Sequence, residues 1–110
     1  MTTNKLPEDF EYLKDMYEDE YFPKFLVDKL RDIIKECVTY IEQGNHGQQE
    51  IQKELDRIVL KTNDLQEEFE VNDSEIETVA RESIGETIEK ILKHFEIDID
   101  IEEAIRERDW

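Results

Sequence analysis

The chain has few basic residues and few candidates for covalent cross-links. Its 110 residues include 14 Lys and Arg against 31 Asp and Glu, a formal net charge of −17, so its surface repels the phosphates of nucleic acids and anionic membranes. A single Cys excludes an internal disulfide, and no apolar run is long enough for a signal peptide or a bilayer-spanning helix. We therefore expect a cytoplasmic protein that binds neither nucleic acid nor membrane.

Glycine and proline are also scarce, and this leaves long uninterrupted segments. Within them, apolar residues recur every three or four positions, which is typical of one face of a helix. The pattern predicts three long helices: one from Pro23 to the turn at 43–47, one from that turn to the break at 71–73, and one from Ser74 to Phe95. Shorter helices are predicted from Pro7 to near Tyr17 and, capped by Asp100, from 101 to about 108.

Long helices joined by short loops are antiparallel neighbours. The expected fold is therefore all-α: an up-and-down antiparallel bundle of three long helices plus short N- and C-terminal helices. A chain of 110 residues fits one domain, so we predict a single helical domain over residues 1–110, with residues 1–6 as a disordered N-terminal tail.

Residue types that carry catalysis or bind metals are scarce or poorly placed. Cys37 lies on an apolar helix face between Ile33 and Ile41, so we expect a buried, unreactive thiol. The two His residues stand alone, without the spacing of metal ligands. Acidic pairs such as Glu67 with Glu70 carry little information, because chance predicts about eight of them in so acidic a chain. We expect no catalytic residue, cofactor or metal.

Aromatic residues gather around the start of the first long helix. Tyr17, Tyr21, Phe22 and Phe25 all fall within the segment MYEDEYFPKF. These rings either pack beneath the short N-terminal helix or form a patch that binds a partner. Trp110 has the same two interpretations, since it is either an anchor for the last helix or an exposed recognition element.

The segment NDSEIETVARE, residues 72–82, reads first as the start of a helix. Ser74 and Glu77 have the spacing of a capping box, and Asp73 favours the positive end of the helix. On a helical wheel Glu77 and Arg81 turn toward the core, where they could form an ion pair. With Asn63 or Asp73 nearby, these two residues are the candidates for a concealed polar site.

Four segments together resemble a small bacterial family classed as domain of unknown function 5713. They are YEDEYFPKFLVDK, NDLQEEFE, NDSEIETVARE and the closing RDW. The resemblance runs from about Tyr17 to Trp110, and it departs from the family in IGETIEKILKHFEIDID, where the family is more aromatic and less rich in Lys. The resemblance implies a small helical domain. It transfers no catalytic residue, because the family has no established activity.

Two classes of function remain open. The lopsided charge and the lack of a catalytic set favour a protein-interaction module that binds a basic partner protein, as immunity or antitoxin-like proteins mask basic toxins. The alternative is a metal-binding protein or hydrolase that uses an inward Glu/Arg/Asn cluster. A homodimer formed through the aromatic patch is compatible with either, so the sequence allows a monomer or a homodimer.

Overall fold

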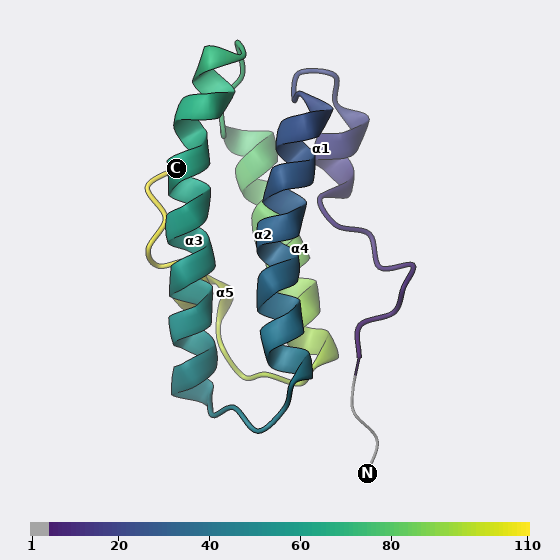
Figure 1. The fold of residues 1–110 in the computed structure, drawn as a ribbon, viewed down its shortest axis with the longest axis vertical. Helices are drawn as coiled ribbons and strands as arrows, with labels where there is room; N and C mark the ends of the chain where they lie inside the picture. Colours follow the sequence, from purple (N-terminus) through teal and green to yellow (C-terminus); the bar gives the residue numbers. More distant parts are fainter. Residues whose placement is uncertain (1–4) are drawn as a thin grey trace.

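Three long helices stand side by side in a computed structural model, which describes residues 5–110 (Figure 1). In chain order the helices are α1 (Lys14–Glu18), α2 (Lys24–Glu42), α3 (Gln48–Val71), α4 (Thr78–His94) and α5 (Ile101–Ala104). Helix α2 runs the length of the bundle, α3 returns beside it, and α4 runs back behind them (Figure 1). Helix α1 packs on α2 and α4, and α5 packs on α3 and α4. The predicted all-α antiparallel bundle is confirmed.

Each long helix buries the apolar stripe that its sequence predicts. The stripes face one another and form one hydrophobic core, to which the short helices and the C-terminal segment add apolar side chains. The largest side chains of this core that are fully buried include Phe22, Met16, Leu26, Leu30, Ile34, Leu55, Ile58, Phe69 and Ile84. Burial of this area is the main force that holds the helices together.

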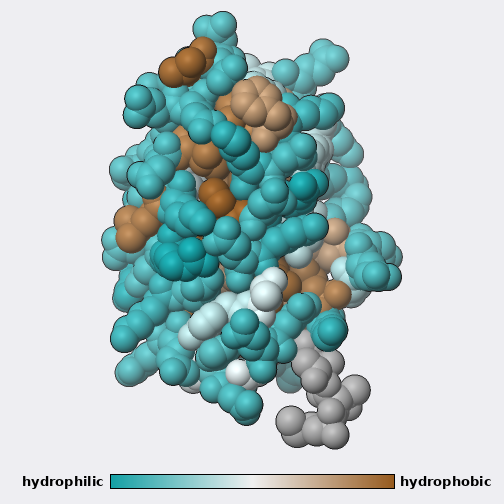
Figure 2. Space-filling view, viewed as in Figure 1, coloured by the Kyte–Doolittle hydropathy of each residue, from teal (hydrophilic) through white to brown (hydrophobic). Residues whose placement is uncertain are grey.

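The surface is hydrophilic over most of the face seen in Figure 2, where hydrophobic side chains form small separate patches. Among residues 5–110, no helix combines the length and the apolar character needed to cross a bilayer.

The predicted helix from Pro7 is wrong, because the chain becomes helical only at Lys14. Leu13, which precedes α1, has a left-handed backbone (φ 52°). A right-handed helix cannot pass through a residue in this conformation. This residue is completely buried, and its amide donates to Thr87 Oγ1 of α4 at 3.1 Å. The contact with α4 therefore holds Leu13 in this conformation, and a continuous helix from Pro7 cannot form.

The two ends of the chain also differ from the predictions. Residues 1–4 of the expected tail lie outside the described residues, but Leu6 packs against the core and its amide donates to Glu42 Oε2 at 3.0 Å. At the other end, Asp100 caps α5 by accepting from the amide of Glu102 at 3.1 Å, as predicted. Helix α5 ends at Ala104 and does not reach Arg108.

We expect the Thr87→Val substitution to lower the free energy of unfolding by about 1–3 kcal/mol, because the Leu13 amide would stay buried without an acceptor. Urea denaturation measures the change. Thr39→Val is the matched control: Thr39 is an exposed residue of α2, so its replacement should change stability by less than about 0.5 kcal/mol. Equal losses in the two variants would contradict a structural role for this hydrogen bond.

Candidate functional site

The turn before α2 and the loop before α4 lie at the same end of the bundle (Figure 1). Between them is a hollow of about 400 Å³. We call it the Tyr21 hollow; it is lined by Asp19, Tyr21, Glu75, Glu77 and Val79. The lining thus combines one aromatic ring and one aliphatic side chain with three carboxylates, and it contains no basic residue.

Tyr21 is held at the surface by its buried neighbour. Phe22 is 1% exposed and meets Phe69 of α3 edge to face, with 6.5 Å between the ring centroids. Tyr21 remains 44% exposed, and its ring lies edge to face with that of Phe22 at 5.1 Å. Its amide also donates to Asp19 Oδ1 at 3.0 Å. The aromatic ring is therefore both accessible and fixed in position.

Other apolar side chains extend this end of the molecule. Phe25, in the first turn of α2, is 51% exposed, and Val79 of the hollow is 37% exposed. The predicted aromatic cluster is thus divided, with Phe22 in the core and Tyr21 and Phe25 at the surface. Exposed apolar area beside charged groups is a common feature of surfaces that bind other proteins.

The electrostatics of the hollow favour a cation. Partial desolvation, followed by the negative charges of Glu75 and Glu77, raises the pKa of the Tyr21 phenol above its ordinary value. The phenol is therefore neutral at pH 7, and the negative face of its ring adds to the field of the carboxylates. A Lys or Arg side chain that entered the hollow would meet both.

The structure brings together Tyr21 and Glu77, two of the residues singled out from the sequence. Asp73 lies in the same loop, where it is exposed and has a left-handed backbone (φ 60°). Tyr17 does not belong to the exposed patch. Its hydroxyl donates to Asp28 Oδ1 of α2 at 2.6 Å, and burial followed by this hydrogen bond raises its pKa to about 12. Tyr17 therefore ties α1 to α2.

The predicted capping box and inward ion pair are wrong. Helix α4 begins at Thr78, so Glu77 is the residue that precedes it and not its third helical residue. Ser74 is buried, and its amide donates to the carbonyl of Phe69 at 2.8 Å, which ends α3 and does not start α4. Arg81 is exposed, and its Nη2 donates to Thr78 Oγ1 at 3.2 Å.

Asn63 lies on α3 and holds the C-terminal segment. Its Nδ2 donates to the carbonyl of Glu107 at 2.8 Å, and its Oδ1 accepts from the amide of Asp109 at 3.2 Å. Trp110 packs against the core, with the guanidinium of Arg108 at 5.9 Å from its ring centroid. The predicted inward Glu/Arg/Asn cluster is therefore not assembled. Nor does the structure, over residues 5–110, gather three His, Cys, Asp or Glu side chains that could hold a metal ion.

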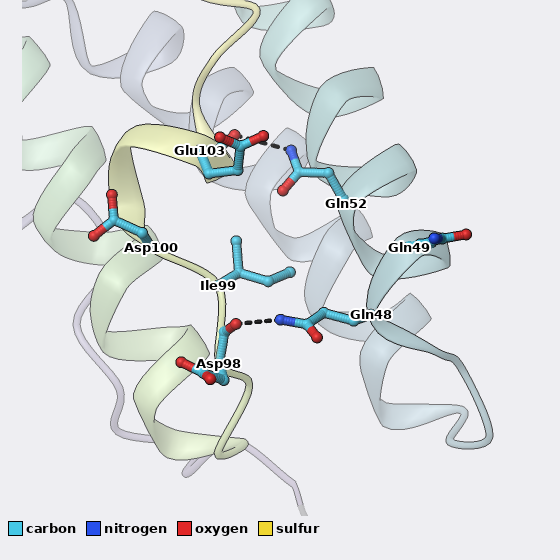
Figure 3. A pocket seen from close by; sticks show the side chains of 7 residues that line it. All are labelled: Gln48, Gln49, Gln52, Asp98, Ile99, Asp100 and Glu103. Carbon is cyan, nitrogen blue, oxygen red and sulfur yellow. Dashed lines mark hydrogen bonds between the residues drawn. The ribbon is translucent and has the colours of Figure 1, made fainter.

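Sequence reasoning missed a second cleft of about 400 Å³, which lies between the start of α3 and residues 98–103 (Figure 3). Gln52 Nε2 donates to the carbonyl of Glu103 at 3.0 Å, and Gln48 Nε2 donates to that of Asp98. Ile99 lies between these two hydrogen bonds (Figure 3). The amide donors are thus occupied in binding the segment before α5, so the cleft is a structural junction. A pair of Gln residues one helical turn apart was its only sequence signal.

Comparison with known proteins places this arrangement in a family. Residues 6–110 match the family of unknown function DUF5713. The chain belongs to this family. The match covers the Tyr21 hollow and every helix, and it confirms the resemblance found in the sequence. No curated protein and no solved structure matches the chain.

The one cysteine of this DUF5713 protein is buried, as predicted. Cys37 is 2% exposed, and burial, with a smaller contribution from Glu54, raises its pKa to about 12. The thiol is therefore protonated at neutral pH, and its sulfur is a poor nucleophile. Cys37 therefore contributes to the packing of the core.

We expect the Tyr17→Phe substitution to lower the free energy of unfolding at pH 7 by about 1 kcal/mol, because the hydrogen bond from the Tyr17 hydroxyl to Asp28 is lost. The Tyr17 pKa is raised in the folded state, so the stability that it contributes is complete below pH 10 and is lost as the pH rises to about 12. Urea denaturation at pH 7 and pH 11.5 should therefore show a deficit that shrinks at the higher pH. A deficit of equal size at both would contradict this assignment.

Proposed function

We propose that the chain is a small acidic protein-interaction module that binds a basic protein through the Tyr21 hollow. One observation carries the proposal: an exposed, fixed aromatic ring bordered by the carboxylates of Asp19, Glu75 and Glu77, with no cation in the lining. In binding, a Lys or Arg side chain of the partner lies over the Tyr21 ring and pairs with a carboxylate at the rim.

The energetics of such a contact support the proposal. A cation over an aromatic face contributes about 0.5–2 kcal/mol, with the higher value when water is excluded. The apolar side chains of Phe25 and Val79 supply area that the partner can cover and so exclude water. A buried hot spot bounded by polar groups is the usual arrangement at the centre of a protein interface.

The charge of the whole chain supports it as well. Many of its basic side chains already contact acids of the same chain, as Lys61 contacts Glu36 at 3.0 Å and Lys29 contacts Glu68 at 2.8 Å. The large surplus of acids therefore stays uncompensated, and a net charge of −17 attracts a basic protein over long distances. It also repels a second copy of the chain, which disfavours a homodimer.

A partner of this kind suits an immunity or antitoxin-like role, in which an acidic domain masks the basic surface of a toxin. The chain would act by occupying that surface and would need no catalytic group. The alternative function, a hydrolase or metal-binding protein, required an inward cluster of Glu77 and Arg81 with Asn63 or Asp73. Asn63 instead binds the C-terminal segment, and Arg81 is exposed, so no observation favours the alternative.

We expect an octa-arginine peptide, added to the ¹⁵N-labelled chain and followed by NMR, to shift resonances most strongly in residues 19–25 and 72–79. Tyr21→Leu should weaken binding about tenfold, because it removes the aromatic face, while Tyr21→Phe should keep most of the affinity. Added salt should weaken every interaction. Shifts spread evenly over the acidic surface, together with unchanged affinity in Tyr21→Leu, would overturn the proposal.

A further inference from the structure

A larger hollow, separate from the Tyr21 hollow, lies along the outer face of α4. We call it the α4 groove, and its volume is about 520 Å³. The largest share of its lining comes from α4, and the rest comes from Asp15 of α1, from α5 and from the segment that follows α5. The groove therefore lies where three helices and the C-terminal segment meet.

Gly85 lies in the lining of this groove, in the middle of α4. Glycine destabilises a helix interior relative to alanine, so its presence calls for a physical reason. The usual reasons are absent here. Gly85 has no positive φ, and a Cβ built on it would meet nothing within 4 Å. Neither the backbone nor the packing of the chain itself requires glycine at this position.

What glycine provides is a notch in the surface of α4. Helices pack most closely where small side chains let their backbones approach. The wall beside the notch includes the indole ring of Trp110, which is only partly buried. The exposed part of this ring supplies apolar area that a partner can cover. The notch and the ring together form a surface that suits a helix packed against Gly85 and Trp110.

The charges of the groove select the sign of this partner. Five acidic side chains line it against two basic ones, and they are Asp15, Glu82, Glu86, Glu89 and Glu102 against Arg81 and Arg108. Arg108 is itself 3.6 Å from Glu102, so its charge is partly used within the chain. A second copy of so acidic a chain would be repelled. A basic helix, which carries its cations to both rims of the groove, is complementary.

We propose that the α4 groove binds a basic helix of a partner protein, packed over the notch at Gly85. This proposal goes beyond the Tyr21 hollow and stands whether or not that hollow binds a partner. The helix would lie along α4 between α1 and the C-terminal segment, with its small or aliphatic side chains on Gly85 and its Lys or Arg side chains beside the acids of the rims.

The probe that tests the proposal is a synthetic 18-residue amphipathic helix of Lys, Ala and Leu, added to the ¹⁵N-labelled chain. The control peptide has the same composition but contains two D-residues that prevent helix formation. We expect the helical peptide to shift resonances of residues 81–89 and 101–110, and the control peptide to bind at least tenfold more weakly. Shifts confined to residues 19–25 and 72–79 would support the Tyr21 hollow and overturn the α4 groove.

Variants of Gly85 make the test specific. Gly85→Leu fills the notch and should weaken binding of the helical peptide at least tenfold, and Gly85→Ala should have a smaller effect. Thr39→Leu, at an exposed position of α2, is the matched control and should bind as the parent does. Unchanged affinity in Gly85→Leu would overturn the proposal.

Thermal unfolding of Gly85→Ala checks the premise without any ligand. Its melting temperature should rise by about 2–6 °C, because alanine favours the helix and meets no obstacle in the structure. A lower melting temperature would show that the fold itself needs glycine at this position, and it would remove the argument for a partner.

Discussion

The contact between Phe22 and Phe69 fixes the end of the bundle on which the Tyr21 hollow depends. Phe22 leads the chain into α2 and Phe69 lies near the end of α3; the planes of their buried rings are 77° apart. Tyr21 cannot enter the core while its neighbour occupies that place. The amide of Ser74 donates to the carbonyl of Phe69, which turns the chain back and brings Glu75 beside Tyr21. Phe22 thus positions one side of the hollow, and the carbonyl of Phe69 positions the other.

The distribution of ion pairs explains why the hollow keeps its negative charge. Several basic residues join helices, as when Glu36 of α2 accepts hydrogen bonds from Lys61 and Arg57 of α3. The hydrogen bond from Lys61 is the main reason that the pKa of Glu36 lies below its ordinary value. Cations used along the α2–α3 face are not available at the end of the bundle. Exposed pairs of this kind add little stability, but they determine where the uncompensated acids lie.

The long helices could be predicted from the sequence because an apolar stripe is a local property, and α2, α3 and most of α4 carry one. The short helix α1 could not, since the left-handed backbone of Leu13 depends on Thr87, which is 74 residues away in the chain. The prediction that Glu77 and Arg81 face the core came from a helical wheel, and it assumed that the helix begins at Ser74. The hydrogen bond from the Ser74 amide to the Phe69 carbonyl, five residues earlier, ends α3 at this point, so Glu77 precedes α4 and the predicted ion pair does not form.

The candidate site was accessible to sequence reasoning only in part. The aromatic cluster indicated the correct segment, but it has no helical period before α2, so the pattern could not separate the buried Phe22 from the exposed Tyr21. Gly85 could be read only as a destabilising residue until the structure showed open space around it. Folding alone requires neither an exposed ring among carboxylates nor a glycine within a long helix. Residues that lower stability, and that the fold itself does not require, are typical of surfaces where a protein binds a partner.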